Sequence, residues 1–222
     1  MLFDLRSRGR RRTVRVVYLG LAVLLGGGLV LFGVGAGSGG GGLLNAFTGN
    51  GSGNAQSQVV SQQEKAALRQ TKLHPGDPSA WSALVRLRYA SSTGNASNYD
   101  SATGAFTAAG KQELAATTSA WQRYVELIKS PDPDIAILAA RAYGALAQYA
   151  GEARAWEIQA LANPTVATGY ECLAVSAYAA KQTRKGDLAL AKALSLVPKL
   201  SRPALKSRIQ AAQTTPAVAQ SC

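Results

Sequence analysis

The residue types that carry most catalytic and metal chemistry are scarce in this chain of 222 residues, which has one histidine and two cysteines. His74 lies in Leu-His-Pro-Gly, with no carboxylate or cysteine next to it, and the separation of Cys172 from Cys222 fits no usual zinc motif. No Gly-x-Ser-x-Gly elbow or phosphate-binding glycine loop accompanies them. We therefore expect no catalytic, cofactor or metal site, and a protein that is not an enzyme.

The two cysteines favour a disulfide instead. An even number of cysteines in a domain outside the cytoplasm is typical of pairing, and the nine residues TTPAVAQSC span about 30 Å when extended. A bond between Cys172 and Cys222 would close a long loop and stabilise the domain by about 4 kcal/mol in the chain-entropy description. The alternative is a buried, free Cys172 with a frayed Cys222.

The net charge of +12 has an uneven distribution. Ten basic residues balance ten acidic ones between positions 56 and 180, whereas from 181 to 208 only Asp187 opposes a candidate basic patch of Lys181, Arg184, Lys185, Lys192, Lys199, Arg202, Lys206 and Arg208. Such a patch attracts an anionic lipid, a cell-wall polymer or an acidic partner, although a solvated helix face is the simpler interpretation. No aromatic residue is interleaved with these cations, so no nucleic acid partner is expected.

A second basic cluster precedes an apolar run at the start of the sequence. The uncharged run from Val16 to Val34 would measure roughly 30 Å as a helix, which matches the hydrocarbon core of a bilayer. Cationic residues beside an apolar segment stay in the cytoplasm, so topology is set by Arg6, Arg8, Arg10, Arg11, Arg12 and Arg15. We expect a single-pass membrane protein with its C-terminal domain outside. A cleaved signal peptide, with cleavage near Ala36 and secretion of the rest, is the alternative.

Composition divides the chain into five parts. Gly, Ser and Asn dominate the segment after the apolar run, which is typical of a flexible linker. The expected divisions are a cytoplasmic basic tail (1–15), a transmembrane anchor (16–36), a linker (37–55), an extracytoplasmic helical domain (56–213) and a C-terminal tail (214–222).

The domain is expected to be all-α, because it is rich in Ala, Leu, Gln, Lys and Arg and its prolines fall between periodic segments. Asp132 and Asp134 flank Pro133 at one helix start and are expected to cap it. The predicted helices cover 56–73, 78–91, 107–129, 133–149, 151–162, 165–181, 184–197 and 202–213.

One spacing of a large residue, a leucine, a small residue and a tyrosine occurs three times in the domain. The three copies are Trp81, Leu84, Val85, Tyr89; Ile135, Leu138, Ala139, Tyr143; and Tyr170, Leu173, Ala174, Tyr178. In the first copy the large residue is Trp and the small position is Val, and in the second the large residue is Ile. Pro131, Pro164 and Pro198 follow them at intervals of 33 and 34 residues. This period indicates helical repeats whose stripes pack on facing stripes such as Leu188, Ala191 and Leu194.

In these residues the chain resembles the tetratricopeptide repeat (TPR) family, in degenerate form because the tyrosine falls one residue late. The Arg-rich start and a Tyr-Asp-x-x-Thr-Gly-x-Phe stretch also resemble membrane-anchored bacterial TPR proteins. The resemblance implies an α-solenoid of about three helix pairs, capped by the helices at 56–73 and 202–213. The insertion at 91–107 is predicted to form a small hairpin near Asp100 to Phe106.

The resemblance also implies a function, namely a tethered scaffold that binds a protein or peptide partner. The alternative from the charge pattern is an envelope factor, beside the translocon or the cell wall, that binds anionic polymers or secreted clients.

Overall fold

The structure is a computed structural model, and it describes the backbone of residues 53–222 and the side chains of residues 59–222. The arginine block, the apolar run from Val16 to Val34 and the cleavage site near Ala36 lie outside the described residues. None of the described helices is long and apolar enough to cross a membrane.

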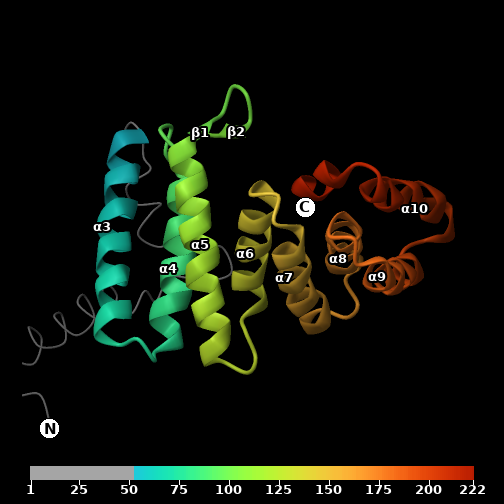
Figure 1. The fold of residues 1–222 in the computed structure, drawn as a ribbon, viewed down its shortest axis with the longest axis horizontal. Coiled ribbons are helices and arrows are strands. Elements are labelled where there is room, and N and C mark those ends of the chain that lie inside the picture. Colours follow the sequence, from blue (N-terminus) through green and yellow to red (C-terminus); the bar gives the residue numbers. More distant parts are fainter. Residues whose placement is uncertain (1–52) are drawn as a thin grey trace, which may run out of the picture. The chain divides into compact units, whose positions relative to one another are not determined.

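Residues Ser57–Cys222 fold as one unit, which is almost entirely helical (Figure 1). The elements, labelled as in Figure 1, are α3 (Gly53–Leu73), α4 (Pro78–Gly94), β1 (Tyr99–Asp100), β2 (Ala105–Phe106), α5 (Ala108–Leu127), α6 (Pro133–Ala145), α7 (Tyr149–Ala162), α8 (Ala167–Ala179), α9 (Thr183–Leu196), η1 (Lys199–Ser201), α10 (Arg202–Gln210), η2 (Ala211–Gln213) and η3 (Pro216–Ser221). The all-α prediction is confirmed for the described part of the chain.

Side-chain caps set where three of the helices begin. Asp77 accepts a hydrogen bond from the Ser79 backbone N–H at 2.9 Å at the start of α4. Asp132 accepts one from the Asp134 N–H at 2.8 Å at the start of α6, and Thr107 caps α5. Each cap satisfies a backbone donor that the first helical turn leaves unpaired. The predicted capping role is therefore confirmed for Asp132, whereas Asp134 lies in the first turn of α6 and donates its backbone N–H to that cap.

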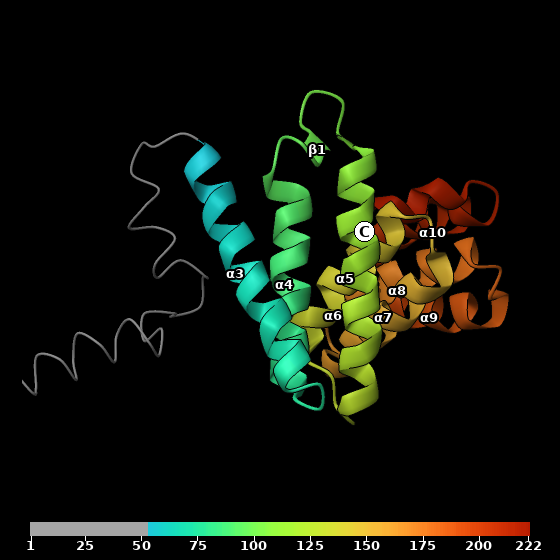
Figure 2. The same ribbon diagram turned by 60° about the vertical axis from the view of Figure 1, so that its left-hand side comes forward.

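The predicted hairpin is present between α4 and α5. β1 pairs antiparallel with β2, with Tyr99 opposite Phe106 and their rings 5.0 Å apart. Gly104 makes the turn with a positive φ of 70°, which glycine adopts at little cost. The hairpin packs on α4 and α5, at one end of that helix pair (Figure 2).

From α4 onward each helix packs on its neighbours in the chain, in the pairs α4–α5, α6–α7 and α8–α9 and between successive pairs. α4 also packs on α6. Small residues line these contacts, since Ala139, Ala140, Ala153 and Ala160 are all fully buried. Small side chains allow neighbouring helices to approach closely, so the core is built from alanine with a few large anchors such as Leu84, Ile135 and Trp156.

The second and third helix pairs share one tyrosine–glycine contact. The ring of Tyr143 on α6 lies directly over Gly151 on α7, and the ring of Tyr178 on α8 lies in the same way over Gly186 on α9. Tyr143 and Tyr178 are two of the tyrosines of the repeated spacing, and both glycines follow their tyrosine by eight residues. The repetition in the sequence thus has a counterpart in the packing.

Substitution of these glycines by alanine is expected to destabilise the unit by about 1–2 kcal/mol. A Cβ atom at Gly186 would lie 2.6 Å from two carbons of the Tyr178 ring, and a Cβ at Gly151 would lie equally close to Tyr143. Overpacking costs about 1–3 kcal/mol, and the better helix propensity of alanine offsets up to about 1 kcal/mol of it. Urea unfolding measures the change. Gly76→Ala is the control, because nothing lies within 4 Å of a Cβ there; equal stability of all three variants would contradict the contact.

The predicted face of α9 is wrong. Leu188 is 67% exposed, Ala191 is exposed and Leu194 is only half-buried, whereas the buried stripe is Gly186, Ala189, Leu190 and Ala193. The Tyr178 ring occupies the space over Gly186 and so sets the rotation of α9 about its axis. Leu188 therefore points to solvent.

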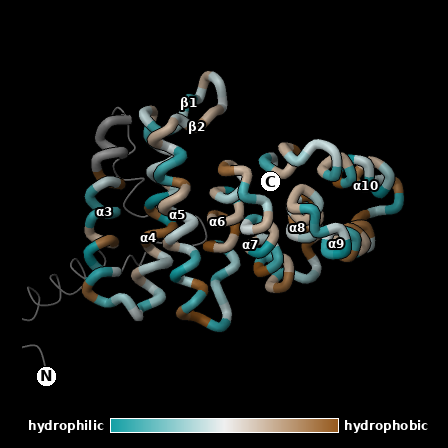
Figure 3. Tube along the Cα trace, viewed as in Figure 1, coloured by the Kyte–Doolittle hydropathy of each residue, from teal (hydrophilic) through white to brown (hydrophobic). Residues whose placement is uncertain are grey.

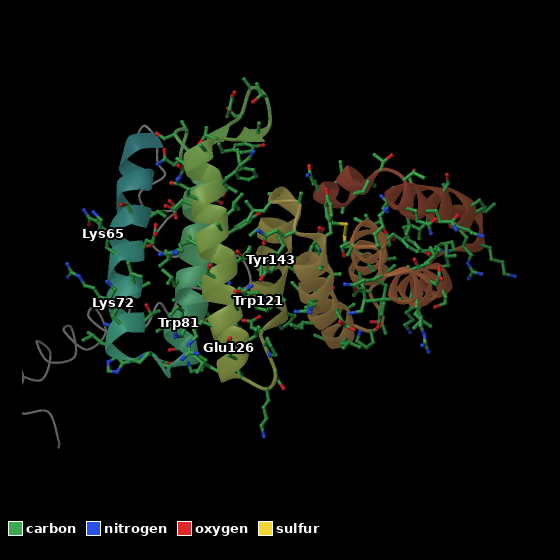
Figure 4. The ribbon with its side chains drawn as sticks, in the orientation of Figure 1. Lys65, Lys72, Trp81, Trp121, Glu126 and Tyr143 are labelled. Carbon is green, nitrogen blue, oxygen red and sulfur yellow. A yellow bond between two sulfur atoms is a disulfide. The ribbon has the colours of Figure 1, made fainter. Side chains whose placement is uncertain are left out.

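Polar helices flank the packed pairs. α3 and α10 carry long hydrophilic stretches (Figure 3), and Lys65 and Lys72 point away from α4 (Figure 4).

Glu64 on α3 forms an ion pair with Arg88 on α4 at 3.5 Å, with both side chains largely buried. Burial raises the pKa of Glu64, with a further contribution from the Glu113 carboxylate. α10 ends at Gln210, and its expected last turn is the 3₁₀ helix η2.

Candidate functional site

The predicted basic patch is spread over α9, η1 and α10 and the turn before α9. Two of its cations are paired with glutamates, Lys185 with Glu157 at 2.7 Å and Arg208 with Glu171. Lys181 instead donates a hydrogen bond to the Gln213 carbonyl at 3.0 Å, and Arg202 donates one to the Val197 carbonyl at 3.3 Å. Arg184, Lys192, Lys199 and Lys206 are exposed. The cluster is thus partly structural and partly available to a partner.

Part of this patch borders a pocket of about 620 Å³ between α7, α8 and α9. Its floor is apolar, with Tyr170 and Leu173 of α8 and Leu188 and Ala189 of α9. The outward direction of Leu188 explains its exposure, because this side chain contributes to the apolar floor of the pocket. The pocket is lined completely by Glu157, Tyr170, Leu173, Gln182, Thr183, Arg184, Lys185, Leu188 and Ala189.

Three cations lie beside this apolar floor, and Glu157 is the one carboxylate that lines the pocket. Arg184 and Lys185 belong to the first turn of α9, and the Nζ atom of Lys192 lies 5.7 Å from the centre of the Tyr170 ring, a cation–π distance. Only one of the three cations, Lys185, has a carboxylate partner among the described residues. An apolar floor with a positive rim favours a ligand that combines a hydrophobic side chain with carboxylates.

A second pocket of about 670 Å³ lies among α5, α6 and α7. Trp121 and Tyr143 lie close together there (Figure 4), and both are almost fully buried, so they serve mainly as core residues. Arg154 is the one cation that lines this pocket. The second pocket offers fewer charged groups that could recognise a ligand than the first pocket, which lies between α7, α8 and α9 and is called the α7–α9 pocket below.

One buried carboxyl group was not identified from the sequence. Glu152 on α7 is 1% exposed, and its carboxylate lies against Gly144 of α6, where glycine leaves room for it. Its Oε2 atom, Trp156 Nε1 and Gln159 Oε1 have no hydrogen-bond partner within the described residues. Burial raises the pKa of Glu152 to about 8, and the Trp156 side chain partly opposes this. Trp156 and Gln159 follow Glu152 by four and seven residues, and this helical spacing was the signal that the three side chains share one buried face.

No group of three or more His, Cys, Asp or Glu side chains in the described part is placed to hold a metal ion. His74 is exposed in the turn between α3 and α4.

Cys172 of α8 is bonded to Cys222 in the structure, with Cα atoms 5.6 Å apart (Figure 4). This is the pairing that the even number of cysteines and the reach of the C-terminal tail favoured. The bond brings residues 214–222 back onto α8.

No family model matches the chain, and neither a curated protein nor a solved structure matches it.

Proposed function

We propose that this protein is a membrane-tethered, extracytoplasmic scaffold of TPR-like helix pairs that binds a protein or peptide partner. The α7–α9 pocket is the observation that carries the proposal, because it joins an apolar floor to a positive rim. The arginine block and apolar run supply the argument for the tether, since they favour an N-terminus in the cytoplasm.

The geometry favours an acidic peptide with one apolar anchor. The exposed Leu188 and the half-buried Tyr170 offer an apolar surface, and burying a side chain of leucine size there contributes about 1.5–3 kcal/mol. Arg184 and Lys192 then select carboxylates near the anchor and exclude basic peptides, because like charges at a shared interface are unfavourable.

Peptide binding measured by fluorescence anisotropy tests this function. The probes are three labelled peptides of equal length with the same central residue, either leucine or phenylalanine. The residues on both sides of it are Glu in the first peptide, Ser in the second and Lys in the third. We expect the Glu peptide to bind most tightly and Leu188→Asp to weaken it at least tenfold, which corresponds to about 1.4 kcal/mol.

Lys129→Glu serves as a matched control, since Lys129 is exposed after α5 and does not line the pocket. It should leave the affinity unchanged. Equal affinity for the three peptides, or equal effects of the two variants, would contradict the assignment of this pocket.

A second candidate is an envelope factor that binds anionic polymers or secreted clients. Lys199 and Lys206 support it, because they lie exposed on η1 and α10 and do not line the α7–α9 pocket. Exposed charges are screened beyond about 10 Å at 0.1 M salt. Polymer binding that disappears with added salt, and that depends on Lys199 and Lys206 but not on Leu188, would favour this function over the scaffold.

A further inference from the structure

α8 is buried on every side over two turns. All residues from Cys172 to Ala179 are buried, which a helix achieves only when neighbours cover its whole circumference. α7 and α9 cover part of α8, and η2, η3 and α10 cover the rest. η3 also contacts α6, so residues 216–221 form a cover over one face of two successive repeats.

The anchoring of this cover changes at residue 213. Ala212 is fully buried, and the Gln213 carbonyl accepts a hydrogen bond from Lys181, so the chain is held firmly to this point. Beyond it, the hydrogen bonds that residues 214–222 make in the described structure reach partners only three or four positions away. The disulfide is therefore the main directional link between this segment and α8.

The apolar contacts of the segment are small. Ala219 is buried, and Pro216 and Val218 are half-buried. Ordering the nine residues 214–222 costs conformational entropy for each one, and the burial of a few small side chains recovers only part of that cost. Without the covalent bond, the segment has little to hold it in place.

The disulfide borders a cavity of about 170 Å³, which Val175 of α8 and Val218 of η3 also line. Cys222 is half-buried, whereas Cys172 is 6% exposed. Cys222 is therefore the more accessible of the two residues to an incoming thiol.

We propose that Cys172–Cys222 is a thiol–disulfide exchange site, and that its reduction by a dithiol releases residues 214–222 from α8 and α6. A thiolate of the dithiol attacks the Cys222 Sγ, the S–S bond breaks, and Cys172 leaves as a thiolate that takes up a proton. The second thiol of the reductant then displaces Cys222 and forms the reductant's own disulfide. The two electrons thus pass from the dithiol to the protein, and release uncovers Cys172 and Val175.

Alkylation of the full chain under native conditions tests release. The protein is treated with dithiothreitol, then pulsed with iodoacetamide, and modification of each cysteine is followed by mass spectrometry. We expect the native disulfide to be reduced without denaturant, and Cys172 to be alkylated within about tenfold of the rate of Cys222, because only departure of the segment exposes it. Reduction that requires urea, or a Cys172 that reacts more than a hundredfold more slowly, would overturn the proposal.

Hydrogen exchange of a Cys222→Ser variant separates release from general loosening. This variant keeps the segment but lacks the bond, so peptides covering 214–222 should exchange at least tenfold faster than in the oxidised protein within the first minute. Peptides from α7 should exchange at the same rate in both proteins over that time. A protected 214–222 segment would show that packing holds it, and faster exchange in α7 would show a purely structural bond; either result contradicts the proposal.

Discussion

Replacement of Glu152 by glutamine is expected to stabilise the helical unit by about 4 kcal/mol at pH 8 and to have little effect near pH 4.5. Glutamine has nearly the shape of a protonated glutamic acid, so it keeps the packing against Gly144 and removes the charge. The effect comes from burial, which raises the pKa of Glu152 to about 8 in the folded protein. No charged side chain contributes to that shift.

The direction of the pH dependence follows from the two pKa values. In the unfolded chain the carboxyl group titrates near its usual pKa of about 4.5, whereas in the folded unit it keeps its proton up to about pH 8. The stabilisation that comes from holding this proton is complete below the pKa of the carboxyl group in the unfolded chain. It is lost as the pH rises through the pKa of the same group in the folded unit. Wild-type stability should therefore fall between pH 4.5 and pH 8, by roughly 1.4 kcal/mol for each pH unit.

Urea unfolding followed by circular dichroism at pH 4.5, 6, 7 and 8 measures this difference. The difference in unfolding free energy between Glu152→Gln and wild type should grow with pH. Glu126→Gln is the control, because Glu126 is exposed on α5 and its replacement should change the stability by under about 0.5 kcal/mol at every pH. A Glu152→Gln variant that is less stable than wild type at pH 8 would show that the carboxylate is ionised and paired in the folded protein.

Local chemistry explains why so many helices were predictable. Asp77, Thr107 and Asp132 cap helix starts through bonds to residues two or three positions away, so each signal is contained in a short stretch of sequence. The hairpin was equally local, because its turn depends on Gly104 and its strands on two residues each. Features of this kind need no knowledge of tertiary packing.

The errors arose where a contact between helices decided the outcome. Both faces of α9 are apolar enough to be buried, and only the Tyr178 ring over Gly186 selects the one that is. Glu152 was overlooked rather than mispredicted, because the room for its carboxyl group depends on Gly144 of another helix. A helical period indicates that a stripe exists, but it does not show which of two overlapping stripes meets the next helix.

The candidate site was predictable only in part. The excess of cations after residue 180 was plain, but sequence alone could not separate Lys185, which pairs with Glu157 of another helix, from the exposed Arg184. The pocket itself depends on Leu188 pointing outward, which is the reverse of the prediction. Long-range pairing and helix rotation therefore determined what the basic patch is available to bind.

Substitution of Gly110 by alanine is expected to destabilise the unit by about 3 kcal/mol, because the obstacle is backbone rather than a movable side chain. A Cβ at Gly110 would overlap the Asn98 carbonyl group, with its carbon 2.8 Å away. That carbonyl also accepts a hydrogen bond from the Thr107 backbone N–H at 2.9 Å, so it cannot withdraw without breaking the hairpin from the start of α5. The gain in helix propensity, about 1 kcal/mol, is too small to compensate.

Gly94→Ala provides the comparison, since Gly94 ends α4 and nothing lies within 4 Å of the position that a Cβ would take there. Urea unfolding should show a loss of stability for Gly110→Ala and no loss for Gly94→Ala. The result bears on binding as well as on stability, because an insertion fixed to α4 and α5 leaves the α7–α9 pocket free for a partner. Equal stability of the two variants would show that the hairpin does not rest on α5, and the insertion would then be free to reach other surfaces of the repeat unit.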